Sequence, residues 1–408
     1  MNKTIIVGAG AAGCMAAVTA ARHGCSVTLI DRNEKIGRKL LITGKGRCNV
    51  TNNCTKDQFM AEITTNGRFL YSAYTAFNSQ DTMAFFENEG VPLKTERGRR
   101  VFPQSDKAMD IVDCFFHLIR KLHIRLICGD ATQLIIEDGE TKGVRCGEKE
   151  YYADSVILCC GGCSYPQTGS TGAGYALARQ AGHTIIEPIA SLVPIITEEK
   201  WCSQVQGLSL RNVTLTLKNE KGKAVYSELG EMLFTHYGVT GPLVLSASAH
   251  IDTKKTNKYT MQIDLKPALS LEQLDKRILR DLTAAQNKDL VNSLDGLLPK
   301  KLIPLVIELA KLEPHKKCSE ITRKERRDLA QQLKSMTLTF KDFRPIAEAI
   351  VTKGGVSVKE IDPKTMESKL CKNLYFAGEI IDVDAYTGGY NLQIAFSTGF
   401  LAGGGQST

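Results

Sequence analysis

Hydrophobic and polar positions in the first thirty residues predict a strand, a tight turn, a helix and a second strand. Residues 4–7 form a short β-branched run, residues 14–23 are rich in alanine and end at Gly24, and residues 26–30 are again mainly apolar. The segment GAGAAG at 8–13 lies between the first strand and the helix. A glycine-rich turn in this strand–turn–helix–strand context is typical of a dinucleotide-binding unit.

Two later strand-like runs extend this pattern far along the chain. Residues 155–160 are followed by two glycines, and residues 374–377 are followed by Gly378 and Glu379. Short apolar runs that end in glycine are typical of buried parallel strands. The chain therefore returns to the nucleotide-binding pattern near its C-terminus.

The segment between about 190 and 340 has a different texture. Residues 192–265 alternate in short β-like stretches, such as 213–217 and 259–265, which are separated by Gly, Asn and Lys. Residues 270–335 have the periodicity of helices, and residues 322–325 form a capping box at the start of one of them. A β-rich insert followed by a helical insert is expected here.

These patterns predict an α/β fold with a discontinuous Rossmann-like domain. We expect that domain to comprise residues 1–190 and 345–408. The inserts divide into a β-rich, barrel-like substrate domain at 191–268 and 336–344 and a small helical domain at 269–335. At 408 residues the chain exceeds the usual size of a single core, which agrees with such a division.

The glycine-rich turn has the spacing of a site for the pyrophosphate of a dinucleotide. Gly8 lets the chain reverse, Gly10 lets the backbone approach a phosphate, and Gly13 lets the helix and strand pack closely. The amides of Ala11 and Ala12 lie at the start of the helix, where the helix dipole favours negative charge. The alternative is a tight turn in an unrelated helix–strand pair.

Asp31 and the C-terminal pattern indicate which dinucleotide binds. Asp31 follows Gly13 by 18 residues and ends the second strand, where a carboxylate accepts hydrogen bonds from an adenosine ribose, and Arg32 comes next. NAD and FAD share this fingerprint. A long insert followed by a C-terminal strand with Gly378 and Glu379 is typical of FAD enzymes, so we predict FAD.

Several longer motifs resemble one flavoprotein family. They are GRKLLITGKGRCNVTN at 37–52, GGCSYP at 161–166 with GSTGAGY at 169–175, LFTHYG at 233–238, and AGE at 377–379 with GGYNLQ at 388–393. The chain resembles the YhiN/BaiN-like flavoproteins, which include enzymes described as aminoacetone oxidases. The resemblance implies FAD, a three-part fold and redox chemistry. It is greatest to the branch of bile-acid reductases, which saturate ring double bonds conjugated to a 3-oxo group.

The first motif also has a physical interpretation of its own. Arg38, Lys39, Lys45 and Arg47 place four cations within ten residues, beside glycines that include Gly46. Such a loop is suited to wrapping a pyrophosphate or stabilising a reduced, anionic flavin. The alternative is a solvated basic loop.

Further cofactor contacts are expected from other segments. Asn49 is placed to hydrogen-bond ring or ribityl oxygens, and Glu379 to meet ribityl or ribose hydroxyls. The backbone of Asn391 and Leu392, at the start of a helix, is expected to face the pyrimidine edge of the flavin. In this fold a strand at the position of Ala131 often contributes an adenine contact.

The candidate proton donors are Tyr165, His236 and Tyr237. Hydride addition to one carbon of an enone requires a proton at the neighbouring carbon, which a tyrosine or histidine supplies. The alternatives are a stacking role for Tyr165 and a structural role in a turn for His236.

Cys160 and Cys163 have the CxxC spacing of a redox disulfide. Relatives more often have Ala-Thr-Gly-Gly at this point, so we interpret Cys159 and Cys160 as small strand residues. No pair of His or Cys residues has the spacing of a closed zinc site, and no metal is predicted.

Charge and composition limit the partners and the compartment. The net charge of +8 and pI near 8.7 favour anionic small molecules, and no zinc-finger spacing or aromatic RNA-binding motif favours nucleic acid. No apolar run is long enough to span a membrane. The odd number of cysteines, 13, is typical of the reducing cytoplasm. Nothing in the pattern specifies an oligomeric state.

The hypothesis that follows is an NADH- or NADPH-dependent flavin reductase. Its substrate is a carbon–carbon double bond conjugated to a ketone, as in a 3-oxo-4,6-diene bile-acid intermediate, free or CoA-linked. No second nucleotide turn is visible, so the nicotinamide is expected to bind at the flavin face. One alternative is an amine or aminoketone oxidase that uses oxygen. Another is a flavin-bearing RNA-associated protein, because residues 323–327 are basic.

Overall fold

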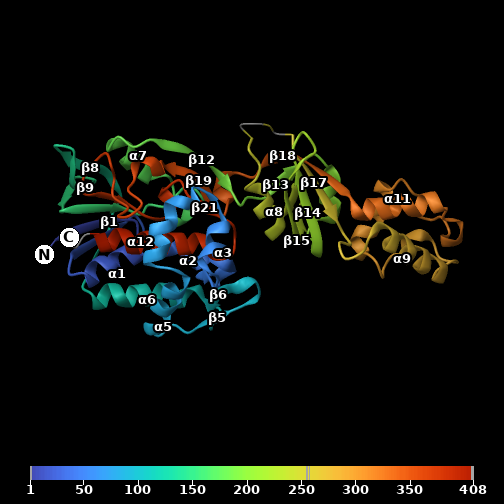
Figure 1. The fold of residues 1–408 in the computed structure, drawn as a ribbon, viewed down its shortest axis with the longest axis horizontal. Coiled ribbons are helices and arrows are strands. Elements are labelled where there is room, and N and C mark those ends of the chain that lie inside the picture. The colour runs from blue at the N-terminus through green and yellow to red at the C-terminus, as the bar shows by residue number, and fades with distance from the viewer. Residues whose placement is uncertain (1, 254–255, 257, 406–408) are drawn as a thin grey trace. The chain divides into compact units, whose positions relative to one another are not determined.

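The fold was analysed in a computed structural model that describes residues 2–253, 256 and 258–405. The chain forms two compact units (Figure 1). Unit 1 comprises Met1–Ser191 and Pro345–Thr408, and unit 2 comprises Leu192–Arg344. Among the described residues, no helix combines the length and the apolar composition needed to cross a bilayer.

A five-stranded parallel sheet forms the centre of unit 1. In spatial order its strands are β20 (Leu374–Phe376), β11 (Ser155–Leu158), β1 (Lys3–Val7), β2 (Ser26–Asp31) and β7 (Arg125–Cys128). All four residues of β11 are buried, as expected for a parallel strand covered on both faces. The two strand-like runs that end in glycine thus become neighbours beside the N-terminal strand.

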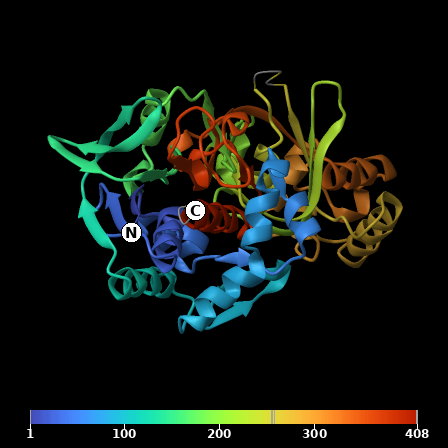
Figure 2. The ribbon, with the colours of Figure 1, turned by 60° about the vertical axis from the view of Figure 1, so that its left-hand side comes forward.

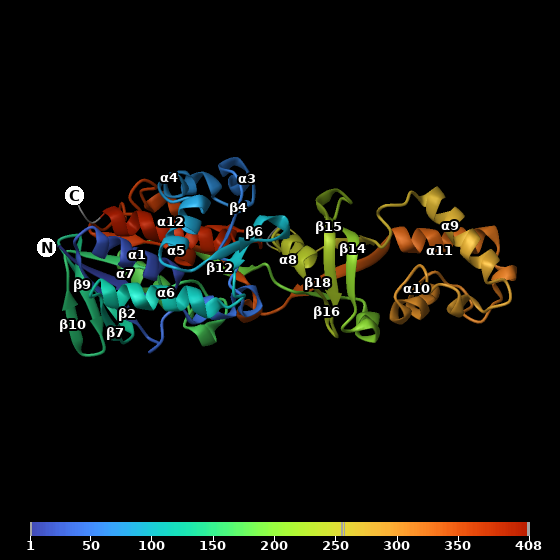
Figure 3. The same cartoon turned by 90° about the horizontal axis from the view of Figure 1, so that it is seen from below.

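Helices α1 (Ala11–Arg22) and α12 (Tyr390–Gly404) pack side by side in unit 1, as Figures 1 and 3 show. A Cβ atom on Gly399 would lie 2.4 Å from the carbonyl oxygen of Ala12. The close approach of the two helices therefore requires glycine at this position. This contact holds the C-terminal segment against the N-terminal nucleotide turn.

Smaller elements complete unit 1, and the antiparallel sheet of β8–β10 lies at its edge in Figures 1 and 2. The small sheets contain β3 (Thr51–Asn52), β6 (Arg100–Pro103) and β5 (Leu93–Thr95); β8 (Ala131–Glu137), β9 (Glu140–Cys146) and β10 (Lys149–Tyr152); β12 (Ile185–Ser191) and β19 (Val351–Val356); and β4 (Ile63–Thr65) and β21 (Asp384–Ala385). The further helices are α2 (Arg38–Ile42), α3 (Lys56–Ala61), α4 (Tyr71–Ala76), α5 (Ser79–Asn88), α6 (Ala108–Lys121) and α7 (Ala173–Gln180).

Unit 2 contains a closed antiparallel barrel. Its strands, in spatial order, are β13 (Ile195–Thr197), β16 (Gly238–Thr240), β15 (Ala224–Phe234), β14 (Ser209–Lys218), β17 (Thr260–Asp264) and β18 (Met336–Phe343). Leu215 and Leu217 of β14 are fully buried, whereas Thr214, Thr216 and Lys218, which alternate with them, are partly exposed. The alternation in the sequence therefore reports the two faces of a barrel wall. Helix α8 (Pro242–Ser248) packs against β15.

The helical part of unit 2 contains α9 (Leu271–Ala284), α10 (Ile303–Leu309) and α11 (Arg323–Lys334). Helix α11 begins with the capping box predicted at Thr322 and Glu325, and both reciprocal hydrogen bonds are present. Arg326 of α11 forms two hydrogen bonds with Asp275 of α9, at 2.7 and 3.0 Å. The two helices lie side by side in Figure 1.

The predicted α/β fold class is confirmed: a Rossmann-like parallel sheet, interrupted by a closed barrel and helices. The strands and helices expected from the sequence are present, with ends that differ by a few residues. Their order in the sheet required the structure.

Candidate functional site

The three glycines of the nucleotide turn have different surroundings. Gly8 has φ +103°, and a Cβ atom on it would lie 2.4 Å from the carbonyl oxygen of Cys159. A Cβ atom on Gly13 would lie 1.7 Å from the carbonyl oxygen of Gly8. A Cβ atom on Gly10, the N-cap of α1, would have no neighbour within 4 Å. Gly8 and Gly13 therefore serve packing, whereas open space at Gly10 fits the approach of a pyrophosphate.

Asp31 holds the turn by hydrogen bonds. Its Oδ2 accepts from the backbone nitrogen of Ala9 at 2.6 Å, and its Oδ1 accepts from the backbone and side chain of Asn33 at 2.7 and 2.9 Å. Arg38 donates to Asn33 Oδ1 at 2.6 Å. Asn33 therefore links Asp31 to Arg38, although the sequence patterns did not single it out. Contact of Asp31 with ribose stays a prediction, which the remaining acceptor capacity of its carboxylate permits.

Arg32 joins the turn to the edge of the neighbouring sheet. It forms an ion pair with Asp130 at 2.5 Å and donates to the hydroxyl of Thr171 at 2.6 Å. Ala131, which follows Asp130, is buried. Arg32 and Ala131 thus belong to one region next to Asp31, where the adenosine half of FAD is expected.

Lys39 and Glu379 were predicted as separate cofactor contacts, and the structure joins them. Lys39 Nζ lies 2.6 Å from Glu379 Oε2 and donates to Ser164 Oγ at 2.6 Å. Glu379 Oε1 accepts from Ser164 Oγ at 3.0 Å and from the backbone nitrogen of Thr352 at 2.8 Å. Gly378, at φ +77°, lets the chain turn before this carboxylate. Four segments therefore meet in one polar network, in which contact with FAD stays a prediction.

Arg47 is engaged with protein carboxylates. It hydrogen-bonds Glu96 and Asp106, and its guanidinium carbon lies 4.1 Å from the centre of the Phe102 ring. The Arg47 hydrogen bond is the main cause that holds the pKa of Glu96 below its usual range. Gly46, at φ +83°, supplies the bend before it. The charge of Arg47 is thus compensated within the chain, and its predicted role toward the cofactor remains untested.

Two buried oxygens fit a flavin next to the start of α12. The side-chain Oδ1 atoms of Asn49 and Asn52 are buried and have no hydrogen-bond partner within the described part of the chain. Buried acceptors normally have donors, so these atoms fit a ligand with N–H or hydroxyl groups. The flavin ring and the ribityl chain both carry such donors.

The first turn of α12 supplies hydrogen-bond donors, in contrast to the acceptor oxygens of Asn49 and Asn52. Asn391 and Leu392 lie in that turn, as predicted, after Gly389 at φ +99°. The side chain of Asn391 is occupied, because it accepts from the backbone nitrogen of Ala385 at 3.0 Å and donates to the Ala385 carbonyl at 2.7 Å. Its backbone N–H remains at the helix N-terminus, where carbonyl oxygens of a flavin would be favoured. Together with the space at Gly10, these groups fit FAD.

The candidate proton donors belong to different units. Tyr165, in unit 1, has φ +51°, and burial raises the pKa of its half-buried phenol. His236 and Tyr237 follow β15 in unit 2, where their rings meet edge to face at 4.9 Å. The guanidinium carbon of Arg344 lies 4.6 Å from the centre of the Tyr237 ring. The rings of His236 and Tyr237 are thus in contact. The catalytic roles of Tyr165, His236 and Tyr237 stay predictions.

Two buried acids were missed by the sequence analysis. Asp384 is fully buried, accepts from Ser191 Oγ at 2.8 Å, and has a second oxygen without a partner among the described residues. The buried hydroxyl of Thr65, opposite Asp384 in the β21–β4 pair, also lacks a hydrogen-bond partner among the described residues. Burial raises the pKa of the neighbouring Asp382. An Asp-x-Asp sequence is too common to reveal such burial.

The thiols near the nucleotide turn are poor nucleophiles. Burial raises the pKa of Cys160 to about 12 and that of Cys159 well above its usual value. A redox role needs a thiolate, so the interpretation as small strand residues is favoured. Among the described residues, no three His, Cys, Asp or Glu side chains gather as metal ligands.

Thiol labelling of the folded protein checks this assignment. Cys128 is the one cysteine classed as exposed in the described chain, and we expect iodoacetamide to modify it first. Cys159 and Cys160 should remain unlabelled until the protein unfolds, as measured by peptide mass spectrometry. Rapid labelling of Cys160 at neutral pH would contradict the raised pKa of its thiol and revive the redox hypothesis.

The family of this chain follows from its similarity to known proteins. The family model described as "HI0933-like protein Rossmann domain" matches residues 2–405. The chain belongs to this family. This match confirms the family resemblance that the sequence motifs indicated.

Two curated relatives match almost the whole chain. The chain is 32% identical over 411 residues to a 3-dehydro-bile acid delta(4,6)-reductase from Clostridium scindens, covering 99% of this chain and 98% of the relative. It is 31% identical over 406 residues to a ribosomal RNA dihydrouridine synthase from Haemophilus influenzae, covering 98% and 97%. These identities are nearly equal.

A solved structure shares the fold. The 3-ketosteroid delta1-dehydrogenase from Sterolibacterium denitrificans matches with a TM-score of 0.54 at 13% identity, over the full length of both chains. At this identity the likeness shows the fold alone. The HI0933-like chain is thus an oxidoreductase-type flavoprotein of Rossmann architecture.

Proposed function

We propose that this protein reduces a carbon–carbon double bond conjugated to a carbonyl group, with NADH or NADPH as the electron donor and FAD as the cofactor. The observation that carries the proposal is full-length similarity to two relatives whose names describe the same kind of chemistry. A delta(4,6)-reductase of a 3-dehydro-bile acid saturates double bonds near a 3-oxo group. Dihydrouridine differs from uridine by saturation of the bond conjugated to the ring carbonyl.

The reaction balances as donor plus proton plus enone, giving oxidised nicotinamide and the saturated ketone. Bound FAD supplies the hydride transfer between donor and substrate. The Gly10 turn would hold the pyrophosphate, and the first turn of α12 would meet the flavin edge. The carbon beside the carbonyl gains its proton from a side chain or from water. Tyr165, His236 and Tyr237 remain the candidates for that donor.

The first substrate candidate is a 3-oxo-dienoic steroid, as in bile-acid dehydroxylation. The Clostridium scindens relative, at 32% identity over nearly the whole chain, supports this choice. A free steroid acid and its CoA thioester are both consistent with the cationic character of the protein.

An anaerobic spectrum in two steps tests this proposal. NADH or NADPH is first added to the purified holoprotein, and a 3-oxo-4,6-dienoic bile acid or its CoA thioester is added next. We expect the flavin absorbance near 450 nm to bleach with the donor and to return with the dienone, with a saturated ketone as the product. Return of colour only on admission of oxygen would contradict the steroid substrate.

The second substrate candidate is a uracil ring within RNA, and the distribution of charge favours it. Unit 2 contains 25 Lys and Arg against 18 Asp and Glu, whereas the rest of the chain contains 27 against 26. Almost all of the net charge of +8 therefore belongs to the insert. The average over the whole chain conceals this asymmetry, which is the footprint expected of a polyanion-binding unit.

Exposed arginines on α11 are placed for phosphate contacts. Arg323 and Arg327 are exposed, lie one turn apart, and form no ion pair with a described carboxylate. Their neighbour Arg326 lowers the pKa of Asp275 chiefly by a hydrogen bond, and the charges of Arg327 and Arg323 add to this effect. These arginines therefore cluster on one side of the helical pair.

RNA binding at several salt concentrations tests the second candidate. We expect the holoprotein to bind a uridine-containing ribosomal RNA fragment with a strong salt dependence. The double variant Arg323→Gln with Arg327→Gln should reduce the slope of log K against log salt by about 1.4 to 1.8, because each phosphate contact contributes roughly 0.7 to 0.9. Lys364→Gln, at an exposed site in unit 1, is the control. Salt-independent binding, or an unchanged slope, would count against RNA.

A further inference from the structure

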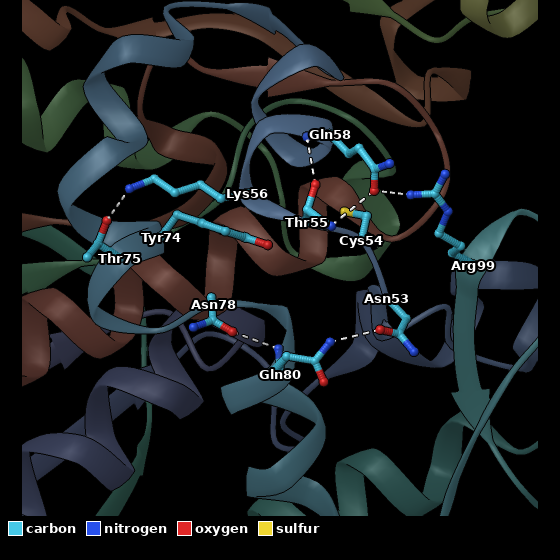
Figure 4. A pocket seen from close by; sticks show the side chains of 10 residues that line it. All are labelled: Asn53, Cys54, Thr55, Lys56, Gln58, Tyr74, Thr75, Asn78, Gln80 and Arg99. Atoms are coloured by element: carbon cyan, nitrogen blue, oxygen red, sulfur yellow. Dashed lines mark hydrogen bonds between the residues drawn. The ribbon is translucent and has the colours of Figure 1, made fainter.

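A pocket of about 660 Å³ opens in unit 1 outside the contacts described above (Figure 4). It is formed by the segment after β3, the start of α3, helix α4, the start of α5 and the loop before β6. The lining residues are Asn53, Cys54, Thr55, Lys56, Gln58, Tyr74, Thr75, Asn78, Gln80 and Arg99. Pockets of this volume typically hold ligands of the size of a nucleotide or cofactor.

The charged groups of the pocket are both cationic. Lys56 Nζ donates to Thr75 Oγ1 at 2.8 Å and lies 3.6 Å from the centre of the Tyr71 ring. Arg99 donates to Gln58 Oε1 beside it, and in Figure 4 these two side chains lie at the opposite end of the pocket from the Lys56 ammonium. No carboxylate lines the pocket, and neither cation forms an ion pair with a described residue. Two uncompensated cations in a cavity without acids favour an anionic ligand.

The backbone at Arg99 is in an unfavourable conformation that directs its side chain. Arg99 has φ +59°, a region that arginine rarely adopts, and it follows Gly98 at φ +76°. Its carbonyl oxygen accepts from the backbone nitrogen of Asn53 at 2.7 Å. Backbone strain of this kind is concentrated at ligand-binding positions. The strained loop presents the guanidinium to the pocket, in agreement with Figure 4.

Uncharged polar side chains make up most of the remaining lining. Gln80 Nε2 donates to Asn53 Oδ1 at 2.8 Å, and Asn78 caps α5 by accepting from the backbone nitrogen of Gln80 at 2.8 Å. Amide side chains carry donors and acceptors together, which suits the hydroxyls of a ribose and the edge of a base. Cations beside amides thus match a phosphorylated nucleoside.

The pocket adjoins the residues that fit the flavin. Asn52 lies next to Asn53 in the chain, and its Nδ2 donates to the carbonyl oxygens of Gly98 at 3.1 Å and Gly388 at 3.0 Å. One side chain therefore joins the Arg99 loop to the loop before α12. Its Oδ1 is one of the buried acceptors without a partner. A nucleotide in the pocket would lie beside the cofactor cradle.

We propose that this pocket binds the phosphorylated adenosine half of NADPH, with Arg99 on the 2′-phosphate and Lys56, at the other end of the pocket, toward the pyrophosphate. The inference rests on the proposed use of a nicotinamide donor. The sequence contains no second nucleotide turn in a strand–turn–helix context, so the donor needs another site for its phosphates. A 2′-phosphate held by Arg99 distinguishes NADPH from NADH, which lacks that group.

Calorimetric titration of the holoprotein with NADP⁺ and NAD⁺ tests the pocket directly. The variants are Lys56→Gln and Arg99→Asn, the latter because asparagine tolerates a positive φ. We expect Arg99→Asn to bind NADP⁺ at least 30-fold more weakly, with affinity for NAD⁺ changed less than threefold, whereas Lys56→Gln should weaken the binding of both. FAD content and melting temperature should match the parent. Lys364→Gln should change neither affinity.

Three outcomes would overturn the proposal. They are unchanged NADP⁺ binding in Arg99→Asn, an equal loss of NADP⁺ and NAD⁺ binding in that variant, and a loss confined to inorganic phosphate, titrated as a third ligand, which would mark an adventitious anion site only. Because no enone is present, these results do not depend on the substrate. An inactive reductase with the expected loss of NADP⁺ binding would contradict the proposed function and leave the pocket assignment intact.

Discussion

Replacement of Gly10 by valine is expected to remove FAD from a protein that still folds. Gly10 has φ −82° and ψ −164°, which any residue adopts, and a Cβ atom there would have no neighbour within 4 Å. A larger side chain therefore fits the chain but occupies the space of the pyrophosphate. We expect the Kd for FAD to rise at least roughly 100-fold, equivalent to about 2.7 kcal/mol.

The visible spectrum and the melting curve of the purified Gly10→Val variant check this expectation. Gly13→Ala is the matched comparison, because its Cβ atom would lie 1.7 Å from a backbone oxygen. Overpacking of this kind costs about 1 to 3 kcal/mol or more, so this variant should lose stability as well as cofactor. A Gly10→Val protein that stays yellow at parental FAD content would refute the assigned turn.

Removal of the Glu379 carboxylate is expected to destabilise the protein even without cofactor. The Lys39 and Glu379 side chains are only 23% and 20% exposed, so Glu379→Ala leaves a largely buried ammonium group without its carboxylate. The free energy of unfolding should fall by about 3 kcal/mol, since loss of one partner of a buried pair costs several kcal/mol and partial exposure reduces the penalty. Urea denaturation of the apoprotein measures it.

A double-mutant cycle separates the pair from direct cofactor contacts. Lys39→Ala combined with Glu379→Ala should be less destabilising than the sum of the two single changes, with a coupling of about 1 kcal/mol or more. Apoprotein is used because FAD then contributes nothing to the measured stability. If Glu379→Ala left apoprotein stability unchanged and lowered only FAD affinity, the carboxylate would belong to the cofactor instead of Lys39.

Local patterns in the sequence determined much of this protein. The GAGAAG turn lies between a strand and a helix, as predicted, because backbone requirements for glycine act within a few residues. Its use as the nucleotide site stays a prediction. Alternation in residues 213–217 correctly predicted a strand of the barrel wall, and the Thr322–Glu325 capping box correctly predicted the start of α11. The motif at 37–52 was sufficient to indicate the family.

Contacts between distant segments were decided only by the tertiary structure. Lys39 and Glu379 are 340 positions apart, and nothing local shows that they pair with each other. The same holds for the compensation of Arg47 by Glu96, the burial of Asp384, and the pocket around Arg99. Sequence periodicity reports which face of an element is buried, whereas the partner across that face depends on how the chain returns. The sequence thus indicated where the cofactor is expected to bind, and the fold decided which charges remain available to a ligand.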